Sequence, residues 1–183
     1  HVDVSHLRLR EERRTNFCVC VSERSINGKE FISCPGDFEP LAPQELDADF
    51  IRSAKILHIG DMLTPAKFAA AELIHGAGGV VSIDAAYYRP DIYENYRYLD
   101  IFIASETYLN AMRADKGNLS CEEACRYIRA QGPEIVMFTL GERGCCGVQG
   151  DQYFELPAFT VDAVDTTAAG DVFHGAFNYA WLQ

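Results

Sequence analysis

The sequence predicts an α/β fold in which a doubly wound, mostly parallel sheet is accompanied by a small β-hairpin. Two observations lead to this prediction. Short apolar runs alternate with helix-like segments through residues 43–183, an order typical of βαβ units whose parallel strands are buried on both faces. Ahead of them, residues 15–34 hold two strand-like runs around a turn signal.

The hairpin comes first. Residues 15–21, TNFCVCV, alternate in polarity and favour a strand, and FISC (31–34) favours a second one. Asn27-Gly28 between them is a turn signal. Proline and glycine residues then interrupt the chain before the rhythm of apolar runs changes: Pro35, Gly36, Pro40 and Pro43.

Strands and helices alternate from there on. We expect a helix over 43–54, a helix that starts at Thr64-Pro65 and ends near His75, and a short helix over 89–98. Ser120 and Glu123 form a capping box before another helix, and a last helix begins near Gly170. The apolar runs between them predict strands at 55–60, 80–84, 100–104 and 134–141, followed by a second hairpin at 145–156.

Composition excludes several classes of partner. The formal net charge is −11, which argues against nucleic acid and anionic membranes because phosphate-rich surfaces need basic ones. We find no apolar run of membrane-spanning length and no signal-peptide pattern at the start, and therefore expect a cytoplasmic protein. The seven cysteines show no C-x-x-C spacing, which favours reduced thiols over a zinc site.

Ligands of such sheets bind at the carboxyl ends of the strands. The segments expected at that edge are Gly60-Asp61, Asp84, Ser105-Glu106, Thr139-Leu140-Gly141 and the loop DTTAAGD, residues 165–171.

The DTTAAGD loop suits an anion. It leads directly into a helix, whose first N–H groups have no intrahelical partner and carry the positive end of the helix dipole. Ala168, Ala169 and Gly170 would let an anion approach this backbone. Asp171 is electrostatically awkward there unless it takes a proton from an attacking hydroxyl. The plainer interpretation is that both aspartates only end a strand and favour the helix dipole.

The two loop motifs resemble those of a known family. VDTTAAGDVFHGAF (164–177) resembles the D-T-x-G-A-G-D signature of the PfkB/ribokinase carbohydrate kinases, with Ala168 in place of the first glycine. VMFTLGERG (136–144) is similar to the family's T-L-G-x-x-G nucleotide loop. The resemblance implies a ribokinase-like fold and ATP-dependent phosphorylation of a hydroxyl on a sugar or sugar derivative.

The resemblance also implies roles for single residues. Asp171 would be the catalytic base, and the N–H groups of Ala168, Ala169 and Gly170 would form the anion hole for the transferred phosphoryl group. Asp165 and the carbonyl of Thr167 would bind a monovalent cation such as K⁺. Mg²⁺ would arrive with ATP, bound mainly by phosphate and water. The ATP phosphates would lie along Thr139, Gly141, Glu142, Arg143 and Gly144.

One motif departs from the family pattern. Members commonly carry N-x-x-E after a central strand, where it helps to place magnesium and phosphate. The matching segment here is Ser105-Glu106-Thr107-Tyr108, which has Ser in place of the Asn and Tyr in place of the terminal Glu. The resemblance therefore implies a weaker magnesium role for this segment, for which Glu106 could partly substitute.

The expected organisation is a single PfkB-type kinase domain over 1–183 that is incomplete at both ends. Residues 15–36 would be a lid hairpin, through which the complete protein would form a homodimer. Residues 43–183 would be the nucleotide-binding core. On this hypothesis the isolated chain has little activity.

Two alternatives remain open. One is a non-catalytic sugar- or nucleotide-binding regulatory member of the same family, which the altered 105–108 segment would permit. The other is a dinucleotide-dependent oxidoreductase, disfavoured because GAGG (76–79) precedes a strand rather than a helix. The sequence does not single out one sugar, although the family's ketohexokinase-like branches share Ser at position 105, which favours a ketose or sugar acid.

Overall fold

The computed structural model describes residues 2–23 and 28–183. The chain forms two compact units, His1–Leu41 and Ala42–Gln183. In the first unit, β1 (Phe17–Glu23) pairs antiparallel with β2 (Gly28–Cys34), with Phe17 opposite Cys34. The predicted hairpin is therefore present; β1 begins and ends two residues later than the predicted run 15–21, and β2 begins three residues before the predicted run 31–34. Asn27 of the predicted turn lies outside the described residues.

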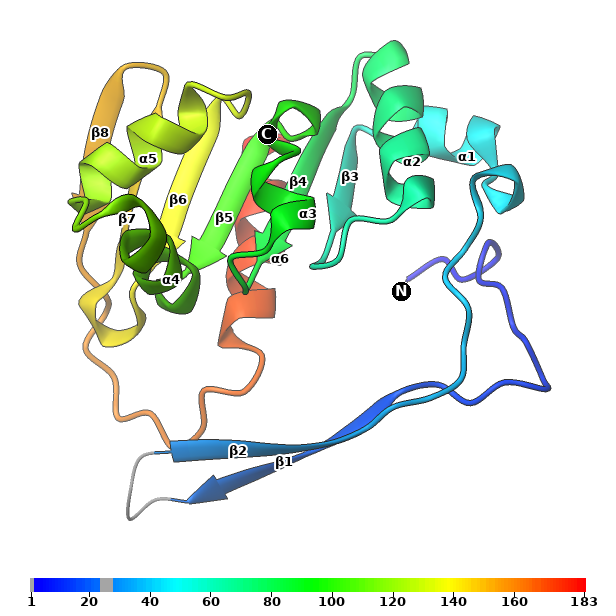
Figure 1. Ribbon diagram of the computed structural model, residues 1–183, viewed down its shortest axis with the longest axis horizontal. Helices are drawn as coiled ribbons and strands as arrows, with labels where there is room; N and C mark the ends of the chain where they lie inside the picture. Colours follow the sequence, from blue (N-terminus) through cyan, green and yellow to red (C-terminus); the bar gives the residue numbers. More distant parts are fainter. Residues whose placement is uncertain (1, 24–27) are drawn as a thin grey trace. The chain divides into compact units, whose positions relative to one another are not determined.

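The second unit is built on a six-stranded sheet in the order β3-β4-β5-β6-β7-β8 (Figure 1). Its first four strands are parallel: β3 (Ile56–Ile59), β4 (Val80–Ala85), β5 (Ile101–Ser105) and β6 (Ile135–Thr139). The last two form an antiparallel hairpin on β6, namely β7 (Cys145–Gln149) and β8 (Gln152–Leu156). This arrangement confirms the predicted mostly parallel α/β sheet.

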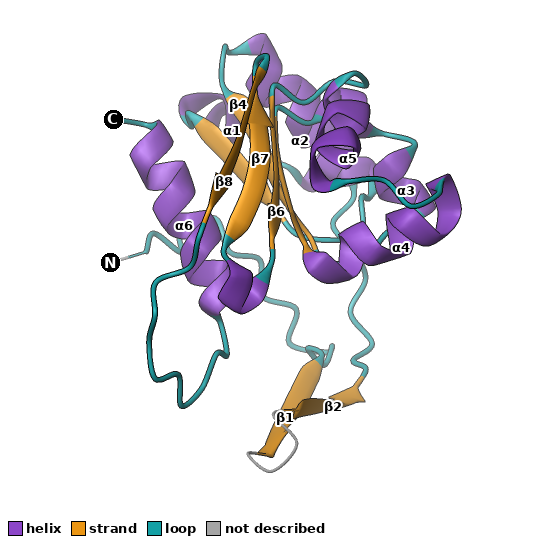
Figure 2. Cartoon of the chain, turned by 90° about the vertical axis from the view of Figure 1, so that its left-hand side faces the viewer, coloured by secondary structure: helices purple, strands orange, loops and turns teal. Residues whose placement is uncertain are grey.

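Helices connect and cover the strands. The α-helices are α1 (Ala48–Ser53), α2 (Pro65–Gly76), α3 (Pro90–Tyr93), α4 (Glu106–Lys116), α5 (Cys121–Arg129) and α6 (Ala169–Trp181). Three short 3₁₀ turns complete the set: η1 (Pro43–Glu45), η2 (Tyr96–Tyr98) and η3 (Gly141–Arg143). Figure 2 shows α2, α4 and α5 on one face of the sheet and α6 on the other.

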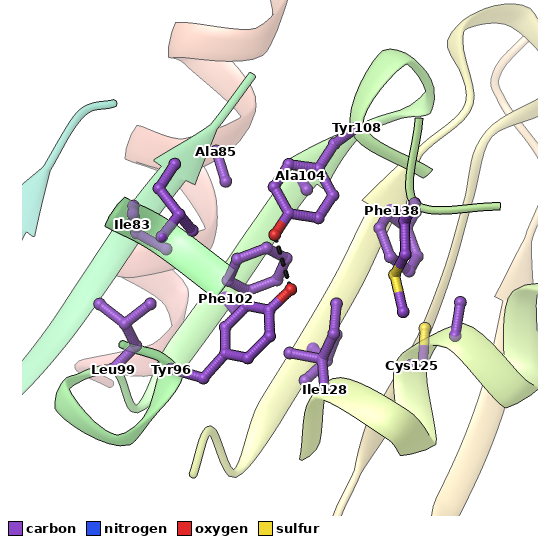
Figure 3. Close-up of a cluster of buried hydrophobic side chains, with 14 of the residues drawn as sticks. Ile83, Ala85, Tyr96, Leu99, Phe102, Ala104, Tyr108, Cys125, Ile128 and Phe138 are labelled. Carbon is purple, nitrogen blue, oxygen red and sulfur yellow. Dashed lines mark hydrogen bonds between the residues drawn. The ribbon is translucent and has the colours of Figure 1, made fainter. Parts of the chain in front are cut away.

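The two faces bury different side chains. Along β4, Val81, Ile83 and Ala85 point into the larger core, under α2, α4 and α5. Figure 3 shows part of this core, where the hydroxyl groups of Tyr96 and Tyr108 lie 2.6 Å apart. The α6 face holds a smaller apolar cluster that includes Ile101, Ile103, Ile135 and Met137, with Phe173 and Phe177 of α6 packed against it.

Three predicted elements differ from the observed ones. The helix expected over 43–54 is interrupted, because Asp47 caps a new helix by accepting a hydrogen bond from the Phe50 N–H at 3.0 Å. The segment 89–98 divides into α3 and η2. No helix is predicted at 106–116, whereas the structure has α4 there, capped by the Ser105 side chain.

Among residues 2–23 and 28–183, we find no helix with the length and apolar character needed to cross a bilayer.

Candidate active site at the carboxyl edge of the sheet

The predicted nucleotide loop, residues 139–144, is a tight turn between β6 and β7. The Leu140 N–H donates to the Gly144 carbonyl at 2.8 Å, which closes the loop around η3. Gly141 and Gly144 have φ angles of 61° and 93°, in the left-handed region that favours glycine. A Cβ on Gly144 would come within 1.9 Å of the Leu156 carbonyl oxygen, so the following hairpin holds this loop in place.

The 105–108 segment meets this loop. Ser105 pairs with Thr139 across β5 and β6, and the carboxylate of Glu106 forms an ion pair with the Arg143 guanidinium. Ser105 Oγ accepts from the Tyr108 N–H at 3.4 Å and so caps α4, while Tyr108 itself is buried. These contacts bring together predicted site residues from two loops. They also leave Tyr108 a core residue rather than one that faces a ligand.

The loop before α6 is exposed along residues 161–172. Asp165 Oδ1 accepts hydrogen bonds from the Thr167 N–H at 2.8 Å and from the Thr167 hydroxyl at 2.7 Å. Ala168, at the N-cap, has a φ of 61°, an uncommon conformation for a residue with a Cβ. The turn ends where α6 begins, at Ala169, one residue before the predicted Gly170.

The first turn of α6 places Asp171 at the expected edge. Figure 1 shows that this end of α6 lies near the carboxyl ends of the parallel strands. A Cβ on Gly170 would meet no heavy atom within 4 Å apart from its chain neighbours and the backbone of its own helix, so the side of Gly170 on which a Cβ would lie is open. Small side chains and an exposed helix N-terminus are compatible with an anion, although the Ala169 N–H donates to the Thr166 carbonyl at 3.2 Å, and the anion hole stays a prediction.

A polar network under α6 was not part of the predicted site. His174 is 4% exposed, and its Nε2 lies 3.2 Å from Oδ1 of Asp84 on β4. This hydrogen bond lowers the pKa of Asp84 below its ordinary value, despite the opposing effect of burial. His58 of β3 lies beside it, with the two imidazole ring centroids 5.4 Å apart.

The environment of His58 fixes its hydrogen bonding. The Asn178 amide donates to His58 Nδ1 at 3.3 Å, and Ser82 Oγ lies 3.2 Å from the same nitrogen. Partial desolvation lowers the pKa of His58, and the nearby His174 lowers it further, while Asp84 and Asp171 act in the opposite direction. His58 is therefore favoured in its neutral form, with Nδ1 as the acceptor. In the sequence, the feature that indicates this network is the spacing of polar residues at 171, 174 and 178, which places them on one face of a helix.

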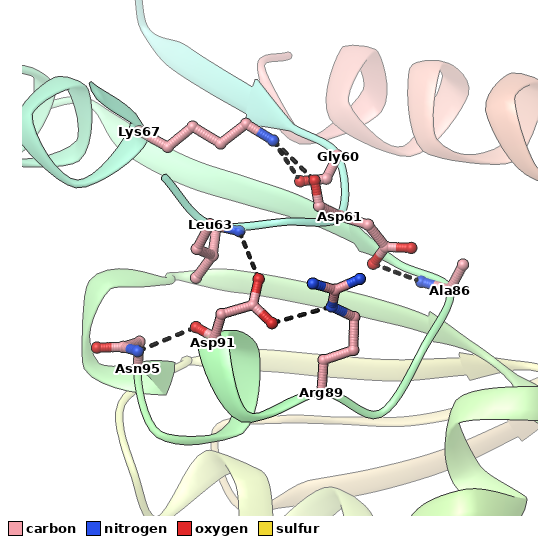
Figure 4. A network of polar contacts seen from close by, with 8 residues as sticks. All are labelled: Gly60, Asp61, Leu63, Lys67, Ala86, Arg89, Asp91 and Asn95. Carbon is pink, nitrogen blue, oxygen red and sulfur yellow. Dashed lines mark hydrogen bonds and ion pairs between the residues drawn. The ribbon is translucent and has the colours of Figure 1, made fainter. Parts of the chain in front are cut away.

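Acidic side chains brace the ends of β3 and β4 (Figure 4). Asp61 Oδ1 accepts from the Ala86 N–H at 3.0 Å, and burial raises the pKa of this carboxyl. Lys67 Nζ donates to the carbonyls of Gly60 and Asp61, each at 2.9 Å. Arg89 forms an ion pair with Asp91 at 3.0 Å. The contacts of Asp61 and Lys67 connect the loop after β3 to α2 and to the loop after β4, and so stabilise the carboxyl edge of the sheet at which the candidate site residues lie.

The adjacent residues Cys145 and Cys146 lie on opposite faces of the sheet. Cys145 packs into the cluster on the α6 face and Cys146 into the larger core, because successive residues of β7 point to opposite faces. All seven cysteine side chains are free thiols. In the described part of the chain, we find no group of three His, Cys, Asp or Glu residues arranged to hold a metal ion.

Comparison with known proteins finds carbohydrate kinases by family, by sequence and by structure. The family model of the pfkB family carbohydrate kinase matches residues 1–183. Fructokinase-2 of Solanum lycopersicum is 30% identical over 152 residues, which are 74% of this chain and 46% of that protein. The crystal structure of a ribokinase from Thermotoga maritima has a TM-score of 0.75 and 26% identity, covering 92% of this chain and 57% of that one.

A second solved structure supports the fold. Arabidopsis thaliana ribokinase, complexed with ribose and ATP, has a TM-score of 0.73 and 23% identity over 92% of this chain and 57% of its own. The chain spans about half the length of the curated relatives it matches, with 52%, 55% and 60% of three of them covered.

Proposed function

Because this chain belongs to the pfkB family of carbohydrate kinases, we propose that the complete protein transfers the γ-phosphoryl group of ATP to a sugar hydroxyl. The observation that carries the proposal is the exposed DTTAAGD loop, which delivers small residues and one carboxylate into the first turn of α6. The curated relatives are sugar kinases, and one structural neighbour was solved with ribose and ATP.

Asp171 is the proposed base. Its carboxylate would accept the proton of the attacking hydroxyl, so that the oxygen forms its bond to phosphorus as the bond to the leaving phosphate oxygen breaks. Its place in the first turn of α6 keeps it beside the backbone N–H groups that would bind the phosphoryl oxygens. The open space around Gly170 supports this arrangement, because charge there can be stabilised by the backbone.

The loop 139–144 is the proposed phosphate-side wall of the ATP site. Thr139, Gly141, Glu142 and Gly144 would line it, and Arg143 would contribute positive charge that its ion pair with Glu106 holds in place. Mg²⁺ bound with ATP would neutralise phosphate charge. Ser105 and Glu106 lie at the same edge, and their part in placing the metal is limited by the capping and ion-pair contacts they already make.

Asp165 and Thr167 are the proposed monovalent-cation ligands. Carboxylate and carbonyl oxygens suit a hard cation such as K⁺, and the turn that joins these residues keeps their oxygens on one short loop. A requirement for K⁺ during turnover would support this assignment.

The substrate is proposed to be a ketose or a pentose. Fructokinases and a ribokinase are among the curated relatives, and Ser105 favours the ketose. The hairpin 15–36 is the proposed lid. Exposed apolar residues on it, including Phe17, Val19 and Ile32, support a homodimer in which a second copy covers them. We expect the 183-residue chain alone to turn over little, because its relatives are about twice as long.

A non-catalytic regulatory member of the family is the second candidate. The observation in its favour is the buried Tyr108 at the end of the altered 105–108 segment, where the family pattern has a carboxylate. Asp171 speaks against it, because a protein that only binds ligands has no need of a base.

The decisive experiment is ADP release by the full-length protein over a panel of sugars, with ATP and sugar binding measured in parallel. Stimulation by one sugar supports the kinase. Binding of ATP or a sugar without stimulated ADP release by any sugar supports the regulatory candidate. Absence of both turnover and binding would contradict both proposals.

A further inference from the structure

His174 is buried on α6 but is poorly suited to a packing role. Its Nε2 donates to Asp84, while its Nδ1 is buried with no hydrogen-bond partner among the described residues. A buried polar atom without a partner costs free energy that an apolar side chain of similar size would not. The one bond that His174 does make, across to β4, is therefore the feature that needs an explanation.

The bond joins α6 to the part of the sheet that carries the candidate site. Asp84 lies near the carboxyl end of β4, and its side chain is 34% exposed, so it reaches the edge of the sheet. One turn further along α6, Asn178 donates to His58 of β3 at 3.3 Å. Two successive turns of the helix are thus hydrogen-bonded to two neighbouring strands.

Asp171 stands on the same face of the helix. Positions 171, 174 and 178 are separated by three and four residues, a spacing that aligns side chains on one stripe of an α-helix. The influence of Asp171 on His58 agrees with this placement. Any rotation or slide of α6 that breaks the His174–Asp84 bond would therefore move the Asp171 carboxylate as well.

We propose that His174 is a positioning residue, whose hydrogen bond to Asp84 fixes the rotation of α6 and with it the direction of the Asp171 carboxylate. This inference rests on the proposed kinase function, in which Asp171 is the base. The apolar contacts of Phe173 and Phe177 hold α6 on the sheet, but apolar contacts lack direction. The hydrogen bond supplies the direction.

The test compares His174→Leu with His174→Gln in the full-length protein. Leucine keeps the volume but removes the donor, whereas the glutamine amide can still donate to Asp84. A base displaced by about 1 Å can cost about 100-fold in rate, so we expect His174→Leu to lower kcat about 10- to 100-fold. KM for ATP and sugar should stay within about threefold, and His174→Gln should recover most of kcat.

Two further variants sharpen the comparison. Asn178→Leu removes the second polar link, two turns from Asp171, and should lower kcat less than His174→Leu does. Tyr179→Phe changes an exposed side chain of the same helix and should leave kcat unchanged. His174→Leu with kcat within threefold of the wild type would overturn the proposal. Equal loss in the leucine and glutamine variants would do so too, because the donor would then not matter.

Hydrogen exchange of residues 169–176 separates this inference from the proposed function. His174→Leu should speed amide exchange in the first turns of α6, and His174→Gln should not, whether or not any sugar is phosphorylated. If the wild-type protein proves inactive, the kinase proposal fails while the exchange result still decides whether His174 holds this helix. Unchanged exchange in His174→Leu would overturn the positioning role.

Discussion

Gly144 lies in the 139–144 loop and Gly170 in the first turn of α6, and the folded chain surrounds these two glycines differently. A Cβ on Gly144 would come within 1.9 Å of the Leu156 carbonyl oxygen, and its φ of 93° already disfavours other residues. A Cβ on Gly170 would meet no heavy atom within 4 Å apart from its chain neighbours and the backbone of its own helix. The fold itself accounts for Gly144, whereas the space beside Gly170 is left open.

The two segments should therefore respond differently to substitution, one mainly in stability and the other mainly in activity. The 139–144 loop is held by its own hydrogen bond and by the hairpin that follows, so a side chain added at Gly144 should act first on folding. The 165–171 loop is exposed and ends in the first turn of α6, so substitutions there should act first on ligand and turnover.

The largest effect is expected at the end of the exposed loop. Asp171→Asn in the full-length protein should lower kcat by about 10³-fold, because general base catalysis typically contributes 10²- to 10⁴-fold. The exposed side chain contributes little to packing, so the melting temperature and the affinity for ATP should stay close to those of the wild type. Steady-state ADP release measures kcat, and calorimetry measures the melting temperature and the affinity for ATP. An Asp171→Asn variant with the kcat of the wild type would show that Asp171 is not the catalytic base.

Gly144→Ala should be the most destabilising change in the braced loop. The added methyl group meets backbone atoms of residues 156–158, and alanine is disfavoured at this φ. We expect the free energy of unfolding to fall by about 3 kcal/mol, measured by urea denaturation. Gly141→Ala is the control: it also places alanine at a positive φ, 61°, but its Cβ meets nothing within 4 Å, so the loss should be smaller.

Gly170→Ala should have the opposite effect to Gly144→Ala: it should lower activity without lowering stability. Alanine is the better helix former by about 1 kcal/mol, so the free energy of unfolding should be unchanged or slightly higher. The methyl group would occupy the space through which an anion reaches the backbone, and we expect kcat/KM for ATP to fall at least about tenfold. Equal activity of the alanine variant would show that the space beside Gly170 has no part in phosphate binding.

Arg143→Ala should give the smallest effect. The Arg143 and Glu106 side chains are 59% and 40% exposed, and exposed ion pairs contribute roughly 0–1 kcal/mol. We expect little change in unfolding and a rise of about threefold in KM for ATP, from the loss of one positive charge near the phosphates. Glu106→Gln keeps Arg143 charged and should leave this KM nearer that of the wild type.

The sheet could be predicted from the sequence because its strands are short and apolar on both faces. Runs such as VVSID and DIFIA can be buried only between two layers, and β4 and β5 are found there. Helix α4 is the element that the prediction lacks. Its signals are local: Ser105 caps it, and Gly117, with a φ of 96°, follows its last residue.

The candidate site was less predictable. Loop motifs could be located because small residues, a strand end and a helix start are adjacent in sequence. The contact between His174 and Asp84 joins positions far apart in the chain, and it depends on how α6 is rotated against the sheet. No local pattern specifies that rotation. The break of the predicted 43–54 helix at Asp47 is different, because a capping residue inside a helical run is visible in the sequence.

The reversal of strand direction after β6 limits how the two loops can vary among related chains. Because β7 runs antiparallel to β6, residues 140–144 alone connect the strands, where a parallel crossover would need a dozen residues or more. One inserted residue there would shift the register of the hairpin and turn its buried side chains to the other face. The longer exposed connection from β8 to α6 carries no such restriction. We therefore expect insertions and deletions to accumulate at 159–164 rather than at 140–144.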